Sequence, residues 1–319
     1  MSTQPPARQP LERFGQILGA PDFTWSRVEG IRARRSPVAR KAKRVLDGIV
    51  VERVVFEADA PEEVPCLLLY PAGIRIAALP LVLALHQTTE PADLGKAEPA
   101  GLAGDRGLAY ALELARKGAV VLAPDYPLFG QYQPDIDRIY EEWGYASVSQ
   151  KGLVNHILAL DALQEITGRY NPVIGVIGHS LGGSNALFLA AHDPRIAACV
   201  CSAGYSSFSS YARHHPMGLA GWALREKYMP RIADEFETRV NRLPSDFDDV
   251  LAAIAPCPLF ISAPTRDDTF ECASARELAE AATPLWPGGD LVLKTPDAGH
   301  SFPDAERRAA YDFLLGRLI

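Results

Sequence analysis

The fold of this chain is decided by the stretch Val173-Ile174-Gly175-Val176-Ile177-Gly178-His179-Ser180-Leu181-Gly182-Gly183. An apolar, β-branched run stops there at a Gly-x-Ser-x-Gly pentapeptide, and the chain continues from Ser184 to His192 with helix-forming residues. This order predicts a strand, a tight turn that holds Ser180 in a strained conformation, and a helix. Gly178 and Gly182 suit positions where these backbones are too close for a Cβ. The alternative is an ordinary loop with a solvated serine, but the flanking strand and helix favour a nucleophile.

Two later strand-like segments end in loops with ionisable side chains. Residues 258–263 run into a loop that holds Asp267 and Asp268, and residues 291–294 run into a loop that ends at His300. A nucleophilic serine needs a base, and the base needs an acid that orients it. The order serine, acid, histidine is that of the α/β-hydrolases. Each group follows the carboxyl end of a predicted parallel strand, where open α/β sheets place their sites.

Composition places the chain among globular proteins with a large core. Of its 319 residues, 48% are hydrophobic and 22% are charged, and the net charge is −7. This acidic balance argues against nucleic acid or an anionic membrane as a partner. The basic segment from Arg32 to Arg44 reads as a solvated helical or linker face before the first strand, rather than a binding patch.

Cysteine usage and the ends of the chain bear on its compartment. The number of cysteines, five, is odd, and four lie in or beside apolar runs, which favours buried free thiols in a reducing compartment. Residues 1–10 are polar without an apolar core, so we expect no signal peptide, and no run of 18 apolar residues predicts a membrane span. We therefore expect a cytoplasmic protein. No cluster of residues has the spacing of metal ligands.

Strand-like and helix-like segments alternate along most of the chain. We expect residues 1–44 to form an N-terminal extension and residues 45–319 an α/β domain, with an eight-stranded, mostly parallel sheet and helices on both faces. The first two strands should form an antiparallel edge. The segment 204–255 is too long for a plain connection and rich in aromatic residues, so we expect a small cap over the site. Tyr205 and Trp222 are its candidate substrate-binding residues.

Within this pattern the chain resembles the α/β-hydrolase superfamily, and within that the dienelactone-hydrolase-like serine esterases and acetyl xylan esterases. The resemblance rests on four segments: residues 85–88 with 95–99, residues 123–126 with 129–130, residues 178–183, and residues 262–270. Dienelactone hydrolases proper have a cysteine nucleophile where this chain has Ser180. In the family the acid stands three residues after the proline of the strand-end turn and three before an aromatic residue. By that spacing the resemblance implies Asp267, between Pro264 and Phe270.

The resemblance and the residues together imply a carboxylic ester hydrolase of small-molecule substrates. Ser180 would attack the carbonyl carbon, and His300, oriented by Asp267, would carry the proton. The backbone N–H of Leu181 and that of Gln87 or Thr88 would form the oxyanion hole, and no cofactor or metal would be needed. A peptidase or amidase with the same triad, or a ligand-binding member without activity, remain alternatives. We expect a structural role for His86.

Overall fold

A computed structural model describes residues 8–34, 36–170 and 173–318, and centres on one nine-stranded sheet. Residues 1–7 of the predicted extension, including most of the segment weighed as a signal peptide, lie outside the described residues. The strand order is β1-β2-β3-β5-β4-β6-β7-β8-β9. The strands span Ala39–Leu46 (β1), Ile49–Glu57 (β2), Glu63–Pro71 (β3), Leu81–Leu85 (β4), Val120–Pro124 (β5), Ile174–His179 (β6), Ile196–Ser202 (β7), Leu259–Ser262 (β8) and Leu291–Lys294 (β9).

The six strands from β4 to β9 are parallel, whereas β1, β2 and β3 join them as an antiparallel edge. Every residue of β4, β5 and β6 is buried, as expected for strands that are covered on both faces. In register, Leu85 of β4 pairs with Gly178 of β6, and His179 pairs with Ser202 of β7. The carboxyl ends of these strands therefore meet at one edge of the sheet.

The sheet has one strand more than the sequence predicts, and the difference is β1. The basic segment, Arg32 to Arg44, was interpreted as a helical or linker face. Arg32 is the last residue of α2, but the residues from Ala39 onward belong to β1, which pairs with β2 from Ala39 against Val55 to Leu46 against Ile49. All but the first of its residues are exposed, because β1 is the edge strand. The antiparallel edge therefore has three strands rather than two.

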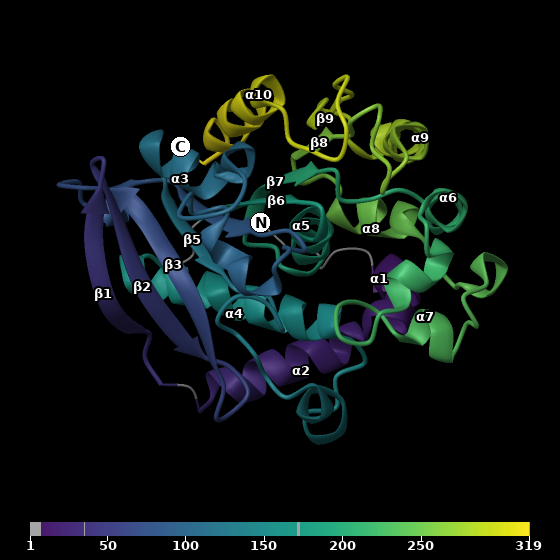
Figure 1. Cartoon of the computed structure of the whole chain (residues 1–319), viewed down its shortest axis with the longest axis horizontal. Coiled ribbons are helices and arrows are strands. Elements are labelled where there is room, and N and C mark those ends of the chain that lie inside the picture. The colour runs from purple at the N-terminus through teal and green to yellow at the C-terminus, as the bar shows by residue number, and fades with distance from the viewer. Residues whose placement is uncertain (1–7, 35, 171–172, 319) are drawn as a thin grey trace.

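Helices cover both faces of the sheet and make three layers (Figure 1). One face carries α1, α2, α4, α5, α8 and α9, and the other carries α3 and α10. The bounds of the helices are Arg8–Leu18 (α1), Pro21–Arg32 (α2), Tyr110–Arg116 (α3), Val148–Thr167 (α4), Leu181–His192 (α5), Phe208–His214 (α6), Arg231–Asp234 (α7), Phe247–Ile254 (α8), Cys272–Ala282 (α9) and Asp304–Leu315 (α10). None of the helices in the described ranges is both long and apolar enough to cross a membrane.

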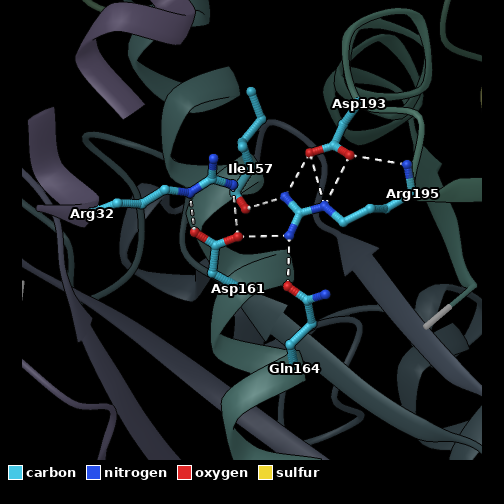
Figure 2. A network of polar contacts seen from close by, with 6 residues as sticks. All are labelled: Arg32, Ile157, Asp161, Gln164, Asp193 and Arg195. Atoms are coloured by element: carbon cyan, nitrogen blue, oxygen red, sulfur yellow. Dashed lines mark hydrogen bonds and ion pairs between the residues drawn. The ribbon is translucent and has the colours of Figure 1, made fainter. Parts of the chain in front are cut away.

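The two N-terminal helices pack against this domain. Phe14 of α1 is buried against Phe188 of α5 and Phe247 of α8, and α2 lies along α4. A polar network then fastens α2 to the core (Figure 2). The Arg32 guanidinium donates two hydrogen bonds of 2.8 Å to Asp161 of α4, and Arg195, before β7, donates to the same carboxylate at 2.6 Å.

The connection between β7 and β8 includes several short helices. It contains α6, the short 3-10 helix η5 (Gly218–Ala223), α7 and α8. Of these, α8 packs on α1 and α5 and so belongs to the helical layer, whereas α6 and η5 contribute to the cavity over the serine turn.

Candidate active site

Ser180 stands alone between the last residue of β6 and the first residue of α5. Its backbone has φ 54° and ψ −121°, a conformation that costs a non-glycine residue energy and that clusters at functional sites. A Cβ on Gly178 would lie 2.1 Å from the carbonyl oxygen of Gly182, and one on Gly182 would lie 2.0 Å from that of Leu85. The crowding expected from the sequence is thus present, and only glycine fits at either position.

Three side chains from different loops form one line of hydrogen bonds. The Ser180 Oγ lies 2.9 Å from Nε2 of His300, and Nδ1 of His300 lies 2.9 Å from Oδ2 of Asp267. A carboxylate accepts only, so Nδ1 carries the proton and Nε2 presents its lone pair to the serine hydroxyl. The Asp267 side chain is fully buried, and its Oδ1 also accepts the N–H groups of Thr269 and Phe270 at 2.8 and 3.0 Å.

The two other carboxylates near this line point elsewhere. Asp268 is exposed, and its Oδ1 lies 3.4 Å from the hydroxyl of Thr269. Asp297 is 83% exposed and pairs with Arg266 at 2.8 Å. Asp267 is therefore the carboxylate that meets the imidazole.

His86 connects the loop after β4 to Tyr126 by hydrogen bonds. Nε2 of His86 accepts the backbone N–H of Tyr126 at 2.9 Å, so its proton is on Nδ1, which donates to the carbonyl oxygen of Gln87 at 2.6 Å. Burial lowers the pKa of His86 and so favours this neutral form. The structural role expected for His86 agrees with these contacts. Because a trans peptide sets C=O and N–H on opposite sides, the Thr88 N–H points away from the His86 ring.

The two side chains of this loop, Gln87 and Thr88, each make a hydrogen bond to another segment. The Gln87 amide donates to Glu98 at 2.9 Å, and the Thr88 hydroxyl lies 2.7 Å from that of Tyr228. Both residues and Leu181 line the cavity that contains Ser180 and His300. Leu181 opens α5, and the first N–H groups of a helix have no acceptor within it.

A second histidine, His179, packs against His300. The ring of His179 is 5.0 Å from that of His300 and stacks on Phe302, and its Nδ1 lies 3.0 Å from the hydroxyl of Ser202. Burial, with the neighbouring His300, puts the pKa of His179 well below its usual range. His179 is thus a neutral packing surface for His300.

The cavity over Ser180 has a volume of about 290 Å³ and a partly aromatic wall. Its lining comes from the loop after β4, the serine turn, the segment 211–228, and the loops that contain Asp267 and His300. The lining residues are Gln87, Thr88, Ser180, Leu181, Tyr211, His215, Met217, Gly221, Trp222, Leu224, Tyr228, Thr269, Phe270 and His300. Trp222, a candidate substrate-binding residue from the sequence, is among these lining residues.

Tyr205 is not brought to this cavity, which corrects the expectation from the sequence. Its side chain is 2% exposed and packs against Phe247 of α8, and its hydroxyl donates to the carbonyl oxygen of Ala275 in α9 at 3.1 Å. Tyr205 lies three residues after the end of β7 and enters the helical layer, whereas the part of this connection that lines the cavity begins at Tyr211.

Sequence reasoning did not single out Tyr211, His215 or Tyr228 for the cavity. The sequence places these residues in the aromatic-rich segment 204–255. However, no rule of spacing predicts which side chains of that segment line the cavity. A buried ion pair between Lys96 and Asp125 was also missed. Asp125 additionally accepts the backbone N–H of Lys96 at 2.9 Å and that of Gln131 at 2.8 Å, which fixes the segment that leads to Glu98.

No group of three or more histidine, cysteine, aspartate or glutamate residues could hold a metal ion among the residues that the structure describes.

Fold and site together define a class of protein. Residues 100–311 match the sequence model of the alpha/beta hydrolase family, and the chain belongs to this family.

The chain is also similar to individual proteins of known name. The chain is 35% identical over 103 residues to the 2,6-dihydropseudooxynicotine hydrolase of Paenarthrobacter nicotinovorans, a match that spans 32% of this chain and only 27% of that protein. Acetyl xylan esterases from a Paenibacillus and a Thermoanaerobacterium species have the same fold. Their TM-scores are 0.66 and 0.65 at 19% and 15% identity, with 93% of this chain and 95% and 93% of theirs covered.

Proposed function

We propose that the protein hydrolyses carboxylic esters of small molecules through an acyl-enzyme on Ser180. The hydrogen-bonded line Ser180–His300–Asp267, on a strained turn that opens into a cavity, is the observation that supports it. The esterases of the same fold are consistent with this chemistry.

In the first half of the reaction the Ser180 oxygen bonds to the ester carbonyl carbon while Nε2 of His300 takes the hydroxyl proton. The carbonyl π electrons move onto its oxygen. When the intermediate collapses, the bond to the alcohol oxygen breaks and His300 gives that oxygen its proton. Water then repeats the sequence on the acyl-enzyme, and the acid is released. Asp267 holds the imidazole in the required tautomer and stabilises the imidazolium.

The oxyanion requires donors that are already in place. The N–H of Leu181, at the start of α5, is one candidate, and the helix dipole adds to it. For the second donor the structure favours Thr88 over Gln87, because His86 holds the Gln87 carbonyl and so turns the Thr88 N–H away from its ring. One such donor is worth about 3 kcal/mol in the transition state.

The test is turnover of p-nitrophenyl acetate and of p-nitroacetanilide by the purified chain, with the Ser180→Ala variant as control. We expect the ester to be hydrolysed and the variant to lose this activity. Faster cleavage of the anilide would instead indicate an amidase. No turnover of either, by a folded protein, would favour a ligand-binding member of the family.

A further inference from the structure

The catalytic cavity carries no formal charge that could meet a charged ligand. None of its described lining residues is an aspartate, glutamate, lysine or arginine. His215 lines it, but its Nδ1 accepts the N–H of Met217 at 3.2 Å, and burial lowers its pKa. The imidazole is therefore neutral near pH 7. A charged ligand group would lose hydration there without gaining a counter-charge, so charged ligands are disfavoured.

Four aromatic rings form one connected wall of the cavity. Trp222 is in the centre, with ring centroids 5.7 Å from Tyr211, 5.4 Å from Tyr228 and 6.1 Å from Phe270. Tyr211 also lies 5.7 Å from Phe270, so the wall joins the cap to the acid loop. Aromatic rings prefer offset-stacked or edge-to-face contact with one another. A flat ring therefore gains more here than a puckered one of equal size.

One hydrogen-bond donor of this wall is available to a ligand. The indole N–H of Trp222 has no acceptor among the described residues, but its nitrogen is buried out of reach of the cavity. The Tyr211 hydroxyl also has no hydrogen-bond partner within the described part of the chain, and it is not among the fully buried polar atoms. A ligand atom that accepts a hydrogen bond from this hydroxyl would therefore be selected.

We infer that the site selects small, uncharged esters that bear a flat aromatic ring and a hydrogen-bond acceptor on that ring. The inference rests on the proposed esterase activity and names its substrate class. The cavity volume of about 290 Å³ lies at the small end of the usual range for ligand sites and favours a single ring over a polymer or long acyl chain.

Matched esters test the ring and the charge without altering the reacting centre. Benzyl acetate and cyclohexylmethyl acetate differ in ring shape on the alcohol side, and methyl phenylacetate and methyl cyclohexylacetate differ on the acyl side. In each pair a methylene separates the ring from the ester. We expect kcat/KM to favour the aromatic ester about tenfold in at least one pair, which corresponds to ~1.4 kcal/mol. 4-Carboxybenzyl acetate should be at least tenfold poorer than 4-methoxybenzyl acetate.

The variant Tyr211→Phe tests the acceptor, because it removes only the hydroxyl and keeps the ring. The wild-type preference for 4-methoxybenzyl over benzyl acetate should fall at least threefold in this variant. Tyr205→Phe is the matched control, since Tyr205 lies outside the cavity, and its preference should equal that of the wild type.

The outcomes separate the inference from the function on which it rests. Ser180-dependent hydrolysis of ethyl acetate with equal rates within both ring pairs would overturn the inference and leave the esterase intact. Preference for the carboxylate ester, or an acceptor preference unchanged in Tyr211→Phe, would also overturn it. Absence of turnover with every ester would instead remove the proposed function.

Discussion

At the scale of single residues, Asp267 and Asp268 offer a sharp comparison, because they are adjacent and only Asp267 meets His300. Asn at the acid position keeps the shape but favours the wrong imidazole tautomer, which can cost about 10⁴ in turnover. We therefore expect Asp267→Asn to be nearly inactive and Asp268→Asn to stay within about threefold of the wild type. Steady-state kinetics on p-nitrophenyl acetate, with thermal melts to confirm folding, measure both. Greater damage in Asp268→Asn would move the acid to that residue.

The backbone donor of Thr88 can be tested by removing its N–H. Thr88→Pro lacks the donor, whereas Thr88→Ala keeps it and loses only the contact with Tyr228. We expect the proline variant to lose about 3 kcal/mol of transition-state stabilisation, roughly a hundredfold in kcat, and the alanine variant less than tenfold. Circular dichroism would establish that both are folded. Equal losses would point to the side chain rather than the N–H.

Sequence reasoning could single out the three residues of the hydrogen-bonded line, Ser180, Asp267 and His300, because each follows a strand and their order along the chain is that of the α/β-hydrolases. Tyr228 could not be singled out, since the Thr88 hydroxyl it meets lies 140 residues away in sequence. Tyr205 was misplaced for a related reason: an aromatic side chain in an insertion fits a cavity wall and a helical layer equally well by composition. The direction of a side chain there depends on packing between distant segments.

At the scale of elements, β1 is the strand that the sequence did not predict. Its sequence, Ala39 to Leu46, lacks the apolar alternation that marks a half-buried strand, because all but its first residue are exposed. Charged side chains on an edge strand protect it from pairing with other chains, so they obscure its own strand signal. The central strands β4 to β6 were predictable for the opposite reason, since burial on both faces leaves a continuous apolar run.

The attachment of α2 gives a prediction at the same scale. Asp161 is 8% exposed and receives both Arg32 and Arg195, whereas the Arg32 side chain is 35% exposed. Asp161→Asn weakens the hydrogen bonds to both guanidinium groups and leaves Arg195 paired with Asp193 alone, so we expect a loss of about 2 kcal/mol. Arg32→Ala should cost about 1 kcal/mol or less. Urea unfolding measures both, and a larger loss in Arg32→Ala than in Asp161→Asn would contradict this order.

At the scale of the whole molecule, the core holds charge that composition does not reveal. Lys151 and Asp59 are fully buried and pair at 2.8 Å. The Tyr145 hydroxyl donates to Asp59, and the amide oxygen of Asn155 accepts from Lys151. The Lys151 ammonium also lies 5.1 Å from the ring of Trp143. Such a site joins α4 to the turn after β2, and its members are too far apart in sequence to be paired by pattern.

Buried histidines make stability depend on pH. Burial lowers the pKa of His156 to about 3 and that of His192 to about 4. The unfolded chain therefore binds protons below about pH 6.5 that the folded chain does not, so stability falls as pH decreases from 6.5 to 4 by up to about 1.4 kcal/mol per unit for each histidine. Asp246, whose pKa burial raises to about 6, opposes this trend equally in wild type and histidine variants.

His156→Phe isolates one of these histidines. Between pH 7 and pH 5 its free energy of unfolding should fall by about 2 kcal/mol less than that of the wild type. Urea titrations at the two pH values give the difference. Parallel pH dependence in the two proteins would mean that His156 is not buried in its neutral form.

The proposed acyl-enzyme chemistry is tested most directly by covalent labelling. A fluorophosphonate should add once to the wild-type chain, as measured by intact mass, and peptide mapping should place the adduct on Ser180. His300→Ala should slow the labelling strongly, since Ser180 then has no base, and Ser180→Ala should abolish it. Stoichiometric labelling of another serine, or no labelling of a protein that still hydrolyses esters, would contradict the assignment.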